Sequence, residues 1–350
     1  MVPRAYRAVA FVIGLFVVVQ LGAVALVPEF TESGYQAVEN PDDPTNSLVY
    51  ILAILVMTAL LLAAFRYDFD RAVRLLIVGV SAWLSWYVFS AVVSPVAAAV
   101  PAVAVGVGLL VYPEWYVIDT AGVLMGAGAA GLFGISFGLL PALILLAFLA
   151  VYDAISVYGT KHMLSLADGV MDLNIPVVLV IPLSLSYSLL DEPATSDGDD
   201  IDGTGGDNTD VTDGDGADVT DGNDADVTDG DGGGATKGDE EIGEPTDIAD
   251  RDAFFIGLGD AVIPAVLVAS AATFSPATAL AVPFISINLP ALLAMGGSLA
   301  GLVILMSWVI KGRPHAGLPL LNGGAIGGYL LGSVLAGVPL IEALGITPFL

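Results

Sequence analysis

Two aspartates lie in stretches of sequence that are otherwise apolar enough for a lipid bilayer. Asp153 stands near the end of one apolar stretch, and Asp260 stands near the start of a later one. An ionised aspartate at membrane depth costs at least about 2.5 kcal/mol on insertion scales, so such residues are usually functional. Two carboxyls within about 3–6 Å of each other cannot both ionise easily, and they share one proton. The ionised member can then take a proton from water while the neutral member hydrogen-bonds a peptide carbonyl, which is the chemistry of amide hydrolysis.

Few other catalytic groups are present in the chain. Its 350 residues include no cysteine and only two histidines, His162 and His315. A disulfide, a thiolate metal site and a cysteine nucleophile are therefore excluded, and a histidine-rich metal centre or a Ser-His-Asp triad has few residues to use. An aspartate pair needs none of these groups, so we expect no metal and no cofactor.

The elements that position the two aspartates should be membrane helices. Hydrophobic residues make up 56% of the chain and charged residues only 13%, which is typical of a polytopic membrane protein. A helix of about 20 apolar residues crosses the hydrocarbon layer. We therefore predict an all-α protein of the cell membrane with about nine transmembrane helices. The predicted spans are Ala8–Val27, Ser47–Phe65, Ala72–Val93, Pro95–Tyr112, Trp115–Phe137, Leu139–Tyr158, Ala253–Phe274, Leu289–Ile310 and Leu318–Leu340.

The basic residues predict the orientation of these spans. With the N-terminus in the cytoplasm, all ten Lys and Arg residues fall in cytoplasmic segments, and the C-terminus is extracytoplasmic. Spans six and seven then run in opposite directions. At 1.5 Å per residue, Asp153 and Asp260 lie about 7–8 Å and about 10–11 Å from the cytoplasmic ends of their spans. This matching depth on one side predicts that the two carboxyls meet.

Most of the net charge of −27 belongs to one segment between spans six and seven. Residues 191–252 hold 23 of the 37 acidic residues, with an eight-residue repeat that begins at Asp210, Asp218 and Asp226. Without apolar periodicity this segment cannot bury a core, so we expect a disordered acidic cytoplasmic linker. Such a composition also suits a halophilic archaeon. The expected organisation is spans one to six plus an extended interfacial segment in 1–190, the linker in 191–252, and spans seven to nine in 253–350.

Prolines and glycines mark two places near the aspartates. The apolar stretch Ile175–Leu190 contains Pro176 and Pro182, which favour an extended interfacial segment over a tenth helix. Gly257 and Gly259 flank the approach to Asp260, where small residues let another backbone come close and weaken the helix. Both features would give a peptide access to the aspartates.

Two more acids lie inside or beside predicted spans. Asp119 is four residues into span five, and Glu342 lies at the end of span nine. Both can reach the membrane interface, so we expect a structural or snorkelling role for each of them.

Three short motifs resemble those of a known family. Tyr152-Asp153 and Gly257-Leu258-Gly259-Asp260 resemble the active-site motifs of the presenilin and signal peptide peptidase family of intramembrane aspartyl proteases. The nine spans, the cytoplasmic N-terminus and the long loop after span six resemble the presenilin branch and its archaeal homologues. The family's third motif, Pro-Ala-Leu followed by Pro, opens span nine, where this chain has Ala316-Gly317-Leu318-Pro319. Literal Pro-Ala-Leu sequences at Pro141 and Pro290 open spans that start outside.

The resemblance implies an aspartic-type endopeptidase that cuts within or near transmembrane segments of membrane proteins or remnant signal peptides. Asp153 and Asp260 would be the catalytic pair that activates water, and Tyr152, Leu258 and Ala316–Pro319 would line the site. The extended segment near Ile175–Val180 is suited to pairing with a substrate strand by edge addition. The expected partners are transmembrane peptides and the bilayer, and no nucleic acid.

An alternative reading of the same two carboxylates is a proton or cation relay in a transporter or channel. Such a relay would need the aspartates, but it gives no reason for the sequence Gly-Leu-Gly-Asp around Asp260.

Overall fold

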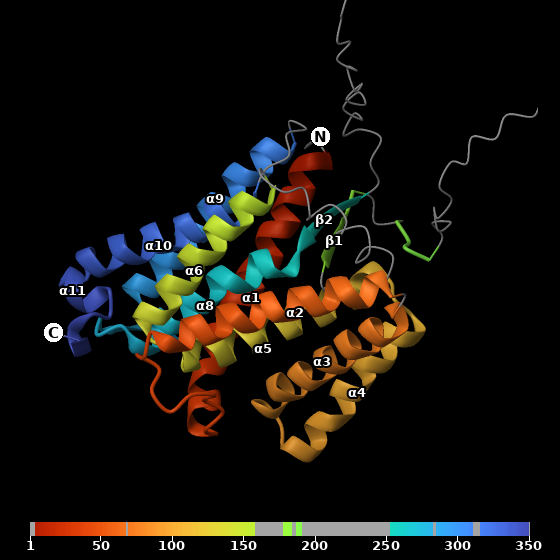
Figure 1. The fold of residues 1–350 in the computed structure, drawn as a ribbon, viewed down its shortest axis with the longest axis horizontal. Helices are drawn as coiled ribbons and strands as arrows, with labels where there is room; N and C mark the ends of the chain where they lie inside the picture. Colours follow the sequence, from red (N-terminus) through yellow and green to blue (C-terminus); the bar gives the residue numbers. More distant parts are fainter. Residues whose placement is uncertain are drawn as a thin grey trace, which may run out of the picture. The chain divides into compact units, whose positions relative to one another are not determined.

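The computed structural model describes residues 4–67, 69–157, 178–183, 187–190, 253–282, 285–310 and 316–349 (Figure 1). Within these ranges the chain forms nine long apolar helices. Six of them are long and apolar enough to cross a membrane, and α4, α6 and α8 are shorter, with 17 residues each. The helices are α1 (Arg4–Glu32), α2 (Thr45–Arg66), α3 (Asp70–Ser90), α4 (Pro95–Val111), α5 (Trp115–Ser136), α6 (Leu139–Ile155), α8 (Leu258–Phe274), α9 (Leu289–Val309) and α10 (Leu318–Leu335).

These helices confirm the predicted fold class, a polytopic all-α membrane protein with about nine apolar helices. Each helix begins within a few residues of the predicted span, except the seventh. Which ends face the cytoplasm, and the division of the chain at residues 190 and 252, stay predictions. The acidic linker 191–252 lies outside the described residues.

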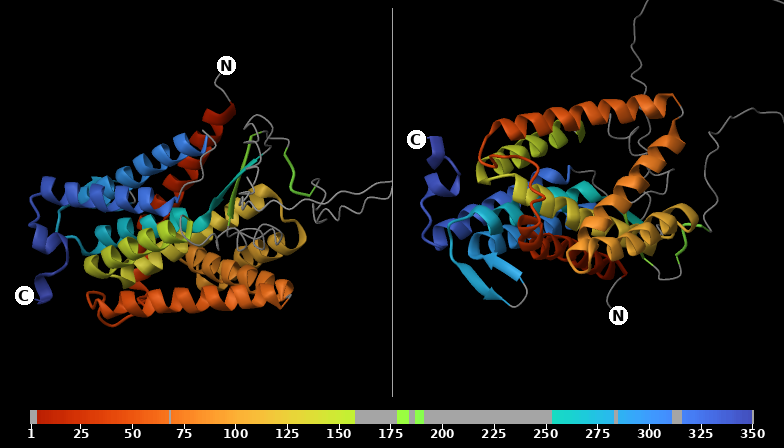
Figure 2. Two further views of the ribbon diagram at one scale, coloured as in Figure 1. Left: turned by 45° about the horizontal axis from the view of Figure 1, so that its top comes forward. Right: turned by 90° about the horizontal axis from the view of Figure 1, so that it is seen from below.

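Two small antiparallel sheets accompany the helices. β1 (Val178–Pro182) pairs with β2 (Ala253–Gly257), with Leu179 opposite Ile256 and Ile181 opposite Phe254. β3 (Ala279–Val282) and β4 (Ile285–Asn288) form a hairpin between α8 and α9. Figure 2 shows this hairpin near the C-terminal end of the chain, apart from β1 and β2.

The predicted seventh span is wrong over its first turn. We predicted a helix from Ala253, whereas residues Ala253–Gly257 form strand β2 and the helix begins at Leu258. Phe254, Phe255 and Ile256 favour a strand, and Gly257 is unfavourable inside a helix. Hydropathy does not distinguish these conformations, and the partner strand lies far away in sequence. Asp260 is therefore in the first helical turn rather than two turns inside.

The ninth span is also shorter than predicted, because α10 ends at Leu335. Gly337 follows with φ +76°, and the Val338 N–H donates to the Ser333 carbonyl at 2.9 Å. A glycine in the left-handed region is the common way to end a helix. Glu342 consequently lies in a separate short helix, α11 (Leu340–Ala343), which is followed by a 3₁₀ turn, Thr347–Phe349.

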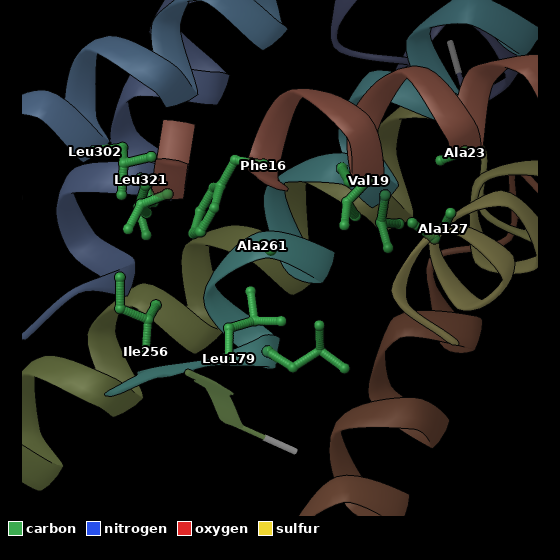
Figure 3. Close-up of a cluster of buried hydrophobic side chains, with 14 of the residues drawn as sticks. Phe16, Val19, Ala23, Ala127, Leu179, Ile256, Ala261, Leu302 and Leu321 are labelled. Carbon is green, nitrogen blue, oxygen red and sulfur yellow. The ribbon is translucent and has the colours of Figure 1, made fainter. Parts of the chain in front are cut away.

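The strands β1 and β2 are built into the helical core. Leu179 and Ile181 are fully buried, and they belong to the same hydrophobic cluster as Phe16 of α1. Figure 3 shows Leu179 and Ile256 together with Phe16, Ala261 and Leu321. Residues 178–182 of the stretch that we expected to be an extended interfacial segment form a strand, and its place at the interface stays a prediction. Residues 175–177 and 184–186 lie outside the described ranges.

Helices α9 and α10 are in backbone contact along their length. A Cβ added to Gly297 would collide with the Gly324 carbonyl oxygen, and a Cβ on Gly328 would collide with the Leu293 carbonyl oxygen. Small residues are what allow helix backbones to come this close in a membrane. Neighbouring Gly296 instead has no atom within 4 Å of an added Cβ.

This difference predicts opposite effects of alanine at two adjacent glycines. Gly297→Ala is expected to destabilise the protein by about 1–3 kcal/mol, because the added methyl pushes α9 away from α10. Gly296→Ala is expected to be neutral or to stabilise by up to about 1 kcal/mol, through helix propensity alone. Thermal unfolding of the two variants in detergent measures the difference. Equal unfolding temperatures would contradict the close contact of α9 with α10.

Candidate active site

Asp153 and Asp260 line one cavity of about 210 Å³. Asp153 stands in the last turn of α6 and is only 6% exposed, while Asp260 is half-buried in the first turn of α8. The two helices therefore bring these carboxyls to the same cavity. This is the meeting that the matching depths in sequence predict.

The start of α10 contacts both carboxyls. The Leu318 N–H donates a hydrogen bond to Asp153 Oδ2 at 3.0 Å, and the Gly317 amide is directed at the same carboxyl. These backbone groups are free to do this because the first N–H groups of a helix have no partner within the helix. The predicted Ala316–Pro319 turn thus holds Asp153 through its backbone.

Gly317 also lies against Asp260. A Cβ added at Gly317 would stand 3.1 Å from Asp260 Oδ2 and 3.4 Å from Leu305 Cδ2. Only a residue without a side chain leaves this much room between the α10 start and the carboxyl. Asp260 in turn stands near the positive end of the α8 dipole, where a negative charge is favoured.

The arrangement suits two carboxyls that share one proton. The Leu318 N–H offers a hydrogen bond to Asp153, whereas no described residue donates one to Asp260, which lines the same cavity. The two groups therefore have different surroundings, and two carboxyls that share one cavity cannot both ionise easily when they lie within about 6 Å of each other. One carboxyl that accepts a proton and one that donates a proton can act together at the same bond.

The edge of β2 that does not pair with β1 lies beside the two carboxyls, and we call it the outer edge. The Val180 N–H of β1 donates to Asp119 Oδ1 at 2.7 Å, so it points away from β2. In an antiparallel pair the residues that face the partner alternate, so Leu179 and Ile181 make the bonds to Ile256 and Phe254. It follows that the N–H and C=O of Phe255 and the N–H of Gly257 point to the outer edge of β2, whereas the C=O of Gly257, the N-cap residue of α8, is directed into the helix. Gly257 and Phe255 both line the cavity.

Four of the ten sequence-predicted site residues line the cavity, namely Asp153, Asp260, Gly257 and Gly317. The other six lie around it. Tyr152 is 39% exposed and stacks on Phe148, with ring centroids 6.3 Å apart. Leu258 and Ala316 are buried, Gly259 is exposed, Leu318 contributes its N–H, and Pro319 stands in the first turn of α10.

Sequence reasoning missed two walls of the cavity. Ala8, Val9 and Val12 of α1 form one wall, and Leu305, Met306 and Val309 of α9 form another. Apolar residues in an apolar helix carry no chemical signal, so no pattern in the sequence separates these six from the lipid-facing ones. The strand residues Phe254–Ile256 had a signal in their aromatic and β-branched composition, which favours a strand.

The remaining sequence predictions near the site have clear outcomes. Asp119 is 4% exposed and accepts the bond from Val180, so it is structural and does not snorkel. The literal Pro-Ala-Leu at Pro141 lies at the opposite end of α6 from Asp153. The one at Pro290 opens α9, whereas the cavity is lined by the other end of that helix.

Comparisons with known proteins agree on one family. The family model described as signal-peptide peptidase, presenilin aspartyl protease matches residues 13–338. A solved structure of a presenilin family intramembrane aspartate protease, in space group C222, is 29% identical, with a TM-score of 0.59 over 93% of this chain and 99% of that one. A second structure so described, in space group P2, is 30% identical, with a TM-score of 0.55 over 92% of this chain and 96% of that one. Among curated proteins nothing matches.

Proposed function

The chain belongs to the signal-peptide peptidase and presenilin family of aspartyl proteases, and from this premise we propose that Asp153 and Asp260 are its catalytic pair. As a member of this family it is an aspartic-type intramembrane endopeptidase and a multi-pass membrane protein. The observation that carries the proposal is the shared cavity, in which both carboxyls contact the Gly317–Leu318 backbone.

The reaction follows from one proton shared between two carboxyls. The ionised carboxyl takes a proton from a water molecule, and the resulting hydroxide attacks the carbon of the substrate peptide carbonyl. The neutral carboxyl donates its proton to the carbonyl oxygen. When the tetrahedral intermediate breaks, the carboxyl that took the proton from water donates it to the leaving nitrogen as the C–N bond breaks. The other carboxyl takes the proton of the intermediate's hydroxyl group, so the pair again holds one shared proton. No covalent intermediate with the protein is needed.

A substrate peptide must lie extended to present its carbonyl, and the outer edge of β2 supports this. The N–H and C=O of Phe255 and the N–H of Gly257 lie two residues apart, as a substrate strand requires. Unpaired backbone is tolerated at membrane depth only where it lines a cavity, and this edge does so. Because the Asp119 contact occupies the outer edge of β1, the sequence-based expectation for Ile175–Val180 shifts to β2 as the docking strand.

The substrate-binding role expected for the neighbouring residues rests on the same geometry. Gly257 and Gly259 keep side chains away from the path between the β2 edge and Asp260. Ala316, Gly317, Leu318 and Pro319 hold the start of α10 against the two carboxyls, and Gly317 leaves the room that a substrate backbone needs. Tyr152 and Leu258 border the site from α6 and α8. We propose that the substrates are single transmembrane segments of membrane proteins or remnant signal peptides.

Cleavage of a single-span peptide tests this function. The purified chain is reconstituted into lipid vesicles together with a transmembrane peptide, and the products are identified by mass spectrometry. We expect two fragments whose new ends lie within or near the membrane segment. If the peptide stays intact while a dye inside the vesicles reports carboxylate-dependent proton uptake, the relay function replaces the protease.

A further inference from the structure

Two acidic residues near the start of α5, Asp119 and Glu114, accept hydrogen bonds from β1 and from the residues that follow it. Asp119 Oδ1 accepts the Val180 N–H at 2.7 Å. Glu114, at the N-cap of α5, accepts the Ser188 hydroxyl at 2.6 Å and the Leu189 N–H at 3.3 Å. Both acids are buried, with exposures of 4% for Asp119 and 5% for Glu114. The two carboxyls thus fix this segment at two points.

We propose that Asp119 is a positioning residue for peptide cleavage, which sets the place of the substrate-docking edge through Val180 and β1. The inference rests on the proposed function, because it assumes that the substrate pairs with β2. Asp119 touches neither the substrate edge nor the two catalytic carboxyls in this arrangement, so its action passes through the sheet.

The geometry makes β1 the element between α5 and β2. One edge of β1 pairs with β2, and Asp119 takes the N–H of its middle residue on the other edge. The Val180 side chain is 3% exposed, and it packs with Ile118 and Leu109 on the α5 side, whereas Leu179 and Ile181 pack on the other face. A displacement of Val180 from α5 therefore moves β2 with it. Gly257, the last residue of β2, is only three positions from Asp260.

The bond between Asp119 and the Val180 N–H matters for the position of β1 because both groups are buried. A buried peptide N–H without an acceptor is costly, so β1 would shift to find water if the carboxyl were removed. Asp119 Oδ2 is also buried, and no described residue forms a hydrogen bond to it. A carboxyl buried with a single bonded oxygen is costly to the fold, and the bond that it does make is to the docking sheet. The role requires an acceptor at Oδ1, which asparagine also supplies.

The test compares Asp119→Leu with Asp119→Asn in the full chain, reconstituted with the single-span peptide. We expect Asp119→Leu to lower kcat/KM about tenfold, mainly through KM, and to spread cleavage over neighbouring peptide bonds. Asp119→Asn should keep the wild-type cleavage position, since its amide oxygen accepts the Val180 N–H. Thr120→Val is the matched control, because Thr120 is exposed and, among the described residues, its hydroxyl bonds only the Tyr116 carbonyl of its own helix.

Several outcomes overturn the inference without touching the catalytic pair. Wild-type cleavage positions and KM in Asp119→Leu would do so, and so would equal defects in the Leu and Asn variants. If Asp119→Leu does not fold, Asp119→Ala removes the acceptor of the Val180 N–H with a smaller side chain, and an unchanged cleavage position in that variant also overturns the inference. Failure of the wild-type chain to cleave any peptide contradicts the proposed function instead.

Discussion

Asparagine at either Asp153 or Asp260 is expected to reduce peptide cleavage at least about 10³-fold while leaving the fold intact. The substitution keeps the shape and removes the proton that the pair shares, so neither water activation nor carbonyl protonation can proceed. In the Asp153→Asn variant, the Leu318 N–H can still donate to the amide oxygen of the new side chain. The rate of product formation in vesicles measures the loss.

Stability separates catalysis from a structural role for the pair. Two carboxyls that line one cavity destabilise the protein, and active sites commonly lower stability in this way. We therefore expect both asparagine variants to unfold at a temperature equal to or above that of the wild type. Glu342→Gln, which changes a carboxyl in α11 away from the cavity, serves as the control with full activity. A variant at Asp153 or Asp260 that loses stability and keeps cleaving would contradict the assignment.

The second large effect is expected at the outer edge of β2. Phe255→Pro removes the N–H that we assign to substrate pairing, and proline is tolerated at an edge where the N–H is not used by the sheet. The substrate carbonyl that loses its donor stays buried and unpaired, so we expect kcat/KM to fall about 10–100-fold. Phe255→Leu keeps the N–H and changes only the side chain, so it should lose much less.

The position of the proline provides the sharper control. Ile256 faces β1, so Ile256→Pro breaks the bond to Leu179 and is expected to lower the unfolding temperature. Phe255→Pro should leave that temperature almost unchanged. If Phe255→Pro cleaves as the wild type does, the substrate does not pair with β2 at this residue. The catalytic pair would stand unaffected by that result.

The helices and the meeting of the two aspartates could be predicted from the sequence, because both depend on length, hydropathy and order along the chain. An apolar stretch of sufficient length forms a helix in lipid whatever its neighbours are. Asp153 and Asp260 lie near adjoining ends of successive spans in sequence, so their proximity follows from the count of spans.

The strands could not be placed in this way. β1 and β2 are separated by 70 residues between Pro182 and Ala253, and their pairing depends on which strand the fold brings alongside. Residues Phe254–Ile256 are as apolar as the residues of the membrane helices, so their hydropathy placed them in the predicted seventh span. The β3–β4 hairpin was missed for a similar reason, since its residues connect two predicted spans and contain no Asn-Gly or Asp-Gly turn signal. The contact of Asp119 with Val180 depends on the β1–β2 sheet, whose pairing the sequence did not predict.

The close seam between α9 and α10 has a mechanical consequence for the cavity. Backbones locked together at Gly297–Gly324 and at Leu293–Gly328 cannot slide without collision, so the two helices behave as a single rigid body. One end of that body carries Leu305 and Met306 from α9 together with Gly317 from the start of α10, and these residues line the same cavity. Motions that widen the site must therefore move α9 and α10 together. During such motions the distance between the cavity residues of α9 and Gly317 stays constant.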